Sequence, residues 1–138
     1  MTRGAAYLDY NATTPIRSEV LDAMLPYFRE HYGNPGSPYF LGQQARKAVE
    51  RAREQVAALL NAKDPQEIVF TSSGSESDTL AMSGAAWSKW EESYGRIRPR
   101  VVSTPIEHDV VRMTLVQLKM RGFDRALAKT DGHGHVAP

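Results

Sequence analysis

The feature that most constrains the fold is a short apolar run that passes directly into small hydroxyl residues, at residues 68–76. Residues 68–70 are Ile-Val-Phe, which predicts a short strand buried on both faces, as in a parallel sheet. Residues 71–75 predict a tight loop at the start of a helix, where free backbone N–H groups and the helix dipole favour a phosphate or another small anion. An ordinary helix cap explains the same residues, with Ser73 as N-cap and Glu76 completing a capping box. This stretch therefore predicts a strand–loop–helix unit, and leaves an anion site and a plain cap both open.

Periodic apolar residues predict the other helices. The clearest helix spans residues 43–60, and two more are expected from residue 75 to about residue 90 and over residues 109–121. Residues 101–102, Val-Val, predict a second short strand. Two strands, each followed by an amphipathic helix, indicate βα units and a parallel sheet. Ligands of such sheets bind outside the carboxyl ends of the strands, where the loop described above and residues 103–108 both lie.

Four motifs occur in order along the chain. They are Leu-Asp-Tyr-Asn-Ala-Thr-Thr-Pro at residues 8–15, Gly-Asn-Pro-Gly-Ser at residues 33–37, the stretch 68–80, and Ile-Glu-His at residues 106–108. Together they resemble the N-terminal part of the cysteine desulfurases, the class V branch of the pyridoxal-phosphate-dependent aminotransferases. Each motif is weak alone, but four in sequence at compatible spacing are specific.

The resemblance implies an α/β fold, a partial pyridoxal-phosphate-dependent transferase of fold type I. Its parallel-sheet βα units would belong to the large domain, preceded by an N-terminal helical segment whose helix starts near Ser18. We accordingly divide the chain into an N-terminal segment, residues 1–42, and an incomplete cofactor-binding large domain, residues 43–138. Residues 33–42 and the pair at residues 108–109 also resemble the selenocysteine lyase subgroup of the same family.

The resemblance implies three cofactor-binding residues. Gly74 and Ser75 match the two-residue phosphate contact of the family, in which a small residue precedes a hydroxyl residue that is usually threonine. His108 matches the histidine whose imidazole stacks on the pyridine ring of pyridoxal 5'-phosphate. Without the resemblance, a surface histidine beside a helix-capping Asp109 would be the simpler explanation. Thr79 stands where the family usually has asparagine, so no role is assigned to it.

Asn11, Ala12 and Thr13 resemble the family segment that passes near the substrate. An Asx-type turn before Pro15 explains the same residues equally well, and both interpretations stay open. We therefore treat the three residues as tentative substrate-binding residues.

The chain lacks the residues that carry out the reaction of the family. The resemblance implies a Schiff-base lysine in a Ser-x-His-Lys motif and a mobile cysteine that receives the substrate sulfur as a persulfide. The sequence contains no cysteine, and none of its five lysines occurs in such a motif: Lys47, Lys63, Lys89, Lys119 and Lys129. We therefore predict no catalytic residue in this chain, and we expect the chain alone to be inactive.

Composition excludes several classes of partner. A formal net charge of +1 gives no electrostatic reason to expect nucleic acid or an anionic membrane as partner. No apolar run is long enough to span a membrane, and no secretory signal precedes the first motif. The lack of cysteine excludes disulfide scaffolds, and His133 and His135 alternate with glycines in a way that predicts no metal site. A cytoplasmic protein is the expectation.

The resemblance thus implies the N-terminal part of a homodimeric cysteine desulfurase. The complete enzyme would convert L-cysteine to L-alanine and pass sulfur to an acceptor protein, for iron-sulfur cluster or thio-cofactor assembly. One alternative is a selenocysteine lyase, which would act on selenocysteine. Another is a truncated, non-catalytic module that pairs with a full-length partner. An open reading frame downstream of codon 138 that encodes Ser-x-His-Lys and a later cysteine would favour the enzyme.

Overall fold

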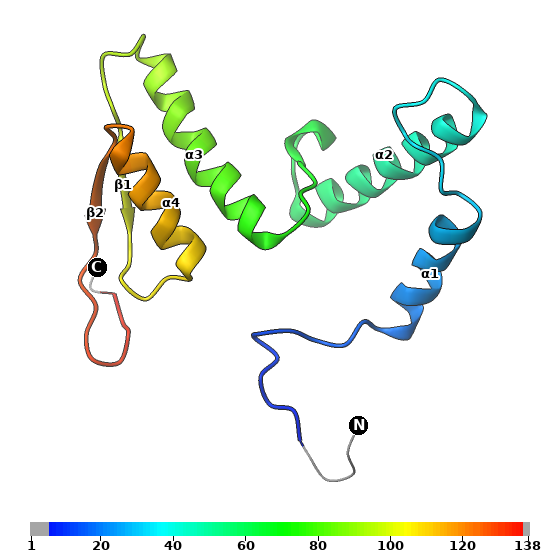
Figure 1. Ribbon diagram of the computed structural model, residues 1–138, viewed down its shortest axis with the longest axis horizontal. Helices are drawn as coiled ribbons and strands as arrows, with labels where there is room; N and C mark the ends of the chain where they lie inside the picture. Colours follow the sequence, from blue (N-terminus) through cyan, green and yellow to red (C-terminus); the bar gives the residue numbers. More distant parts are fainter. Residues whose placement is uncertain (1–5, 137–138) are drawn as a thin grey trace. The chain divides into compact units, whose positions relative to one another are not determined.

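The computed structural model describes residues 6–136, and the chain divides into two compact units, Met1–Val69 and Phe70–Pro138 (Figure 1). The first unit is helical. The second unit contains helices and a parallel pair of strands. The predicted α/β class is therefore confirmed.

The first unit contains α1 (Ser18–Arg29), α2 (Phe40–Leu60) and the short 3-10 helix η1 (Pro65–Glu67). The predicted helix at residues 43–60 is confirmed, and it begins one turn earlier than its apolar stripe. It ends at Asn61, which adopts the left-handed conformation (φ 56°) and directs its N–H to the carbonyls of the last turn. No residue of α1 is buried, although its apolar residues lie on one face of the helix.

Two glycines of the 33–42 stretch are required by close backbone packing in the first unit. A Cβ at Gly33 would lie 2.4 Å from the carbonyl oxygen of Leu41, and a Cβ at Gly42 would lie 2.4 Å from the carbonyl oxygen of Ser37. Both distances are far below a van der Waals contact, so any larger residue would push the loop off the first turn of α2. This packing explains the glycines of the second motif without any ligand.

The prediction of a buried strand at residues 68–70 is wrong for this structure. Ile68 is extended (φ −88°, ψ 118°), and its carbonyl oxygen accepts a hydrogen bond from Arg53 Nη1 rather than from a strand. Val69 is 63% exposed, and the sheet of the described residues consists of two other segments. The apolar run favours an extended backbone, but a strand also requires a neighbouring segment to complete its ladder.

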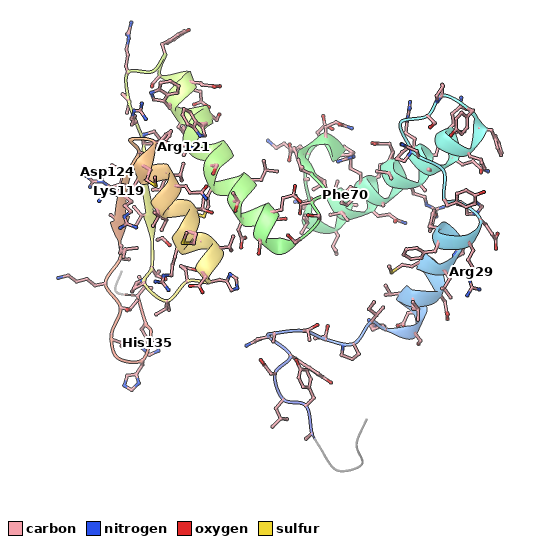
Figure 2. All side chains as sticks on the ribbon, viewed as in Figure 1. Arg29, Phe70, Lys119, Arg121, Asp124 and His135 are labelled. Carbon is pink, nitrogen blue, oxygen red and sulfur yellow. The ribbon has the colours of Figure 1, made fainter. Side chains whose placement is uncertain are left out.

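The second unit contains α3 (Gly74–Glu92), β1 (Arg100–Ser103), α4 (Asp109–Met120) and β2 (Asp124–Leu127). The predicted helices near 75–90 and 109–121 and the predicted strand at 101–102 are confirmed. β1 and β2 are parallel, with Arg100 opposite Asp124 and Ser103 opposite Leu127, so that β1, α4 and β2 form one βαβ unit. Arg100 Nε also donates to Asp124 Oδ2 at 2.6 Å across the pair, and Figure 2 labels Asp124 at the start of β2.

The core of the second unit is an aromatic cluster where α3 and α4 end. Phe123 is 2% exposed, and its ring meets Trp87 edge-on with 4.9 Å between the ring centroids. Trp87 meets Trp90 in the same way at 5.2 Å, and Arg98 lies 5.4 Å from the ring centres of both Trp90 and Phe123. The remaining members of the cluster are aliphatic: Ala86, Val101 and Leu118. This cluster therefore lies at the end of the unit where α3 and α4 finish, and both helices start at the opposite end.

None of the helices in the described part of the chain combines the length and apolar character that a membrane span requires.

Candidate functional site

A capping box forms at the start of α3, as one of the two interpretations of this stretch predicts. Ser73 is the N-cap, and its Oγ accepts a hydrogen bond from the Glu76 N–H at 3.2 Å. The Glu76 carboxylate in turn accepts from both the N–H and the Oγ of Ser72, each at 2.6 Å. The glutamate thus reaches one residue further back than in the usual capping box, where it would bind the N-cap residue itself.

This cap leaves two adjacent donors unused, the N–H groups of Gly74 and Ser75. The first residues of a helix have no intrahelical acceptor, and the cap satisfies only the N–H of Glu76. Within residues 6–136, neither Gly74 nor Ser75 directs its N–H to an acceptor. A Cβ built on Gly74 would meet nothing within 4 Å, so open space lies beside these donors. The cap and an anion site are therefore compatible here, because they use different N–H groups.

We predict that the cap weakens in acid. The hydroxyl and then the backbone N–H of Ser72 lower the pKa of Glu76 from its usual 4.5. A carboxyl whose pKa is lowered by folding stabilises the fold fully above its unfolded pKa, and this contribution disappears as the pH falls through the folded pKa. Thermal unfolding followed by circular dichroism between pH 6 and pH 3 should show that Glu76→Gln destabilises the chain most at pH 6 and progressively less as the pH falls.

Glu91→Gln serves as the control for this measurement, because it removes the same charge from the other end of α3. Equal pH dependence in Glu76→Gln and in the unmodified chain would show that the Ser72–Glu76 contact contributes nothing to stability.

His108 lies at the start of α4, five residues after β1 ends. It is itself the N-cap, because its Nδ1 accepts a hydrogen bond from the Val110 N–H at 3.2 Å and its carbonyl oxygen accepts from Val111 N–H at 3.0 Å. Asp109 is the first helical residue and pairs with Arg112 at 3.0 Å, so the simpler interpretation of Asp109 as the cap is wrong. An Nδ1 that accepts places the proton of the neutral imidazole on Nε2, and His108 as a whole is exposed.

The loop before His108 is short and internally bonded. Thr104 Oγ1 donates to Glu107 Oε1 at 2.8 Å, which closes the turn between β1 and α4. This turn explains how the Ile-Glu-His motif delivers the imidazole at the carboxyl end of β1.

The starts of α3 and α4 lie at the same end of the second unit. Figure 1 shows both helices running opposite to β1 and β2, so both helices begin where the two strands end. Thr79 Oγ1 of α3 lies 3.2 Å from Thr114 Oγ1 of α4. Because Ser75 precedes Thr79 by one turn on the same face, Ser75 stands on the side of α3 that meets α4. The fold thus brings Ser75 and His108 to one edge, with both helix dipoles directed at that edge.

The tentative substrate residues lie in the first unit. Asn11 and Ala12 occupy an exposed turn in which the Ala12 N–H donates to the Asp9 carbonyl at 3.1 Å, and Thr13 follows this turn. The observed turn begins at Asp9 and needs no ligand. Whether these residues also meet a substrate stays a prediction.

The C-terminal histidines are explained by a turn. Asp131 Oδ1 accepts from the N–H groups of His133 and His135 at 2.8 and 2.9 Å, and Asp131 Oδ2 lies 3.0 Å from His135 Nδ1. These contacts, with the His135 N–H first, lower the pKa of Asp131. Figure 2 labels His135 in this loop. Among the described residues no group of three or more histidine, aspartate or glutamate side chains is arranged to hold a metal ion.

The comparisons with known proteins match this architecture. The model of the family described as aminotransferase class-V matches residues 6–138. The chain belongs to the class V aminotransferase family. The cysteine desulfurase IscS of Methylobacillus flagellatus is 46% identical over 135 residues, which cover 97% of this chain and 32% of that protein. A cysteine desulfurase of Trichormus azollae is 42% identical over 130 residues, covering 94% of this chain and 31% of that protein.

Solved structures of the family support the same assignment. A structure described as a NIFS-like protein superposes with a TM-score of 0.80 at 37% identity, covering 94% of this chain and 34% of that chain. Another, described as SspA in complex with cysteine, gives a TM-score of 0.77 at 35% identity, covering 91% of this chain and 35% of that chain. These likenesses confirm the predicted partial fold type I domain. The chain spans about a third of the length of the curated relatives it matches.

Proposed function

We propose that this chain forms the N-terminal, phosphate-binding part of a pyridoxal-phosphate-dependent cysteine desulfurase. The observation that carries the proposal is the pair of unused N–H groups at Gly74 and Ser75, at the same end of the second unit as the start of α4, where His108 is the N-cap. The matched relatives are cysteine desulfurases, and one similar structure is described as a complex with cysteine. These names favour L-cysteine over selenocysteine as substrate.

The residues present fit pyridoxal 5'-phosphate. The N–H groups of Gly74 and Ser75 and the exposed Ser75 hydroxyl would bind the phosphate, because open space beside Gly74 lets an anion approach the backbone. The His108 ring would lie against the pyridine ring, with Nε2–H as its free donor, since Nδ1 is engaged by Val110. When bound, the cofactor supplies an electron sink for the Cα of an amino acid substrate. This chain's own residues bind and orient it.

The proposal assigns the catalytic lysine and the sulfur-accepting cysteine to the two thirds of the relatives' length that this chain does not match. The complete protein would convert L-cysteine to L-alanine and hand sulfur to an acceptor protein, acting as a homodimer in the cytoplasm. Residues 1–42 would form its N-terminal segment and residues 43–138 the first part of its large domain. Asn11, Ala12 and Thr13 would bind the substrate.

Gly74→Ala tests the proposed phosphate site in the complete protein that carries this chain. A Cβ at position 74 meets no atom within 4 Å, so the substitution should not harm folding and removes a residue of low helix propensity. It should nevertheless weaken binding of pyridoxal 5'-phosphate about tenfold or more, roughly 1.4 kcal/mol, because the methyl group occupies the space beside the N–H pair. Ser75→Ala should weaken binding by about 1–3 kcal/mol through the loss of a donor to a charged group.

Gly84→Ala is the matched control. Gly84 lies in the same helix, and a Cβ there also meets nothing within 4 Å. This variant should stabilise α3 by about 0.5–1 kcal/mol and leave cofactor affinity unchanged. Equal affinity in the Gly74 and Gly84 variants, measured by fluorescence titration with the cofactor, would refute the phosphate assignment.

A further inference from the structure

A pair of threonine hydroxyls joins α3 to α4 one turn inside the start of both helices. Thr79 Oγ1 and Thr114 Oγ1 are 3.2 Å apart, and Thr114 is only 3% exposed. The position of Thr79 is one where the sequence departs from the cysteine desulfurase pattern, and no role followed from the sequence for either residue. The contact is a polar link between two helices that also share an apolar cluster near their other ends, which includes Ala86 and Leu118.

The direction of this link follows from the number of protons available. Thr114 Oγ1 donates to the Val110 carbonyl oxygen at 2.8 Å, which uses its one hydroxyl proton. The oxygen of Thr114 can then only accept from its neighbour, so Thr79 is the donor of the pair. The hydroxyls therefore form an ordered series from Thr79 through Thr114 to the backbone of Val110.

Val110 connects this series to His108. The Val110 N–H donates to His108 Nδ1 at 3.2 Å, while its carbonyl oxygen accepts from Thr114. Both backbone groups of Val110, in the first turn of α4, are therefore hydrogen-bonded to side chains: its N–H to the His108 imidazole and its carbonyl to the buried Thr114 hydroxyl. Loss of the hydroxyl would loosen the turn on which the orientation of the imidazole depends.

The Thr79–Thr114 contact also lies near the start of α3. Ser75 and Thr79 lie four residues apart, and Val110 and Thr114 lie four residues apart, so each pair shares one face of its helix. The Thr79–Thr114 contact consequently lies four residues, about 6 Å along each helix axis, from Ser75 and from Val110. A contact at this depth fixes the two helix starts relative to each other.

We propose that Thr79 and Thr114 are positioning residues that set the orientation of His108 relative to Ser75. The proposal rests on the function proposed above, in which His108 and Ser75 hold different parts of one cofactor. Neither threonine touches the cofactor. They act through the first turn of α4, and Thr79 replaces a longer amide side chain with a hydroxyl that reaches Thr114 directly.

The test uses Thr79→Val and Thr114→Val in the complete protein that carries this chain, because valine keeps the shape and removes the hydroxyl. The first readout is the tautomer ratio of His108 without cofactor, from proton–nitrogen correlation spectra of protein labelled with ¹⁵N-histidine. The Nε2–H form should dominate in the unmodified protein, because Nδ1 accepts from Val110. In both valine variants the ratio should move toward that of free histidine, and Thr79→Ser and Thr114→Ser should restore it.

The second readout is turnover of L-cysteine with the cofactor bound. We expect kcat to fall about three- to tenfold in the valine variants with the affinity for the cofactor unchanged, since the orientation of the imidazole changes while the phosphate donors remain. Ser88→Ala is the control, because it removes a hydroxyl from α3 that bonds only Glu92 at 3.1 Å. Thr79→Ala replaces Thr79→Val if the valine variant does not fold.

The outcomes separate this proposal from the proposed function. A tautomer ratio in the Thr79 and Thr114 variants equal to that of Ser88→Ala would overturn the positioning role, whatever the activity. A ratio that moves as expected in a protein that neither binds the cofactor nor turns over cysteine would support the positioning role and overturn the proposed function.

Discussion

Phe123→Ala should lower the free energy of unfolding of the second unit by about 3–5 kcal/mol, the usual range for deleting a buried aromatic ring. Phe123 is 2% exposed and follows α4 directly, where it joins both helices to β1 through Trp87 and Val101. Its removal opens a cavity in the main cluster of buried residues and also removes one of the two rings that Arg98 covers. No other residue in the described part of the unit combines burial in this cluster with a ring contact to Arg98.

Urea titration of dilute protein checks this prediction, with the fluorescence of Trp87 and Trp90 as the probe because both rings lie in the affected cluster. Phe28→Ala is the control. Phe28 is 69% exposed on α1, so its replacement should change stability by no more than about 0.5 kcal/mol. Similar midpoints for the two variants would mean that the aromatic cluster does not stabilise the unit.

The sequence predicted the helices well because their signals are local. The apolar stripe of α2 and the capping residues of α3 depend on neighbours three or four positions away, and α2 and α3 begin and end within three residues of the predictions. The strands depend on distant partners. Residues 68–70 have strong β propensity but no role in the sheet, whereas β2 (Asp-Arg-Ala-Leu) forms without any β-branched residue because it pairs with β1.

In the candidate site, too, the sequence predicted features that depend on neighbouring residues, and it missed two side-chain contacts of α4. The motifs located Gly74, Ser75 and His108, and the hydroxyl-rich loop predicted the cap at Ser73. The capping role of His108 and the Thr79–Thr114 contact were missed, since both depend on how α4 lies against its own first turn and against α3. The available signal in the sequence was a threonine inside each helix: Thr79 lies four residues after Ser75, and Thr114 lies four residues after Val110.

The exposed apolar surface of both units has a consequence for the 138-residue chain on its own. Val102 alternates with Val101, so it lies on the sheet face opposite the helices, and it is 63% exposed. Parallel sheets are normally covered on both faces. In the first unit, α1 exposes Val20, Leu21, Met24 and Phe28, and none of its residues is buried. Surfaces of this kind are association sites in proteins that remain soluble.

We therefore expect the isolated chain to self-associate at micromolar concentration, with a broad thermal transition. Sedimentation velocity over a hundredfold range of concentration, with near-UV circular dichroism, measures both properties. Val102→Lys should shift the distribution toward monomer, because a charge on the open sheet face opposes edge and face pairing. Gln117→Lys adds the same charge at an exposed polar position of α4 and should leave the distribution unchanged. A monomer with a sharp cooperative melt would instead favour a self-sufficient binding module.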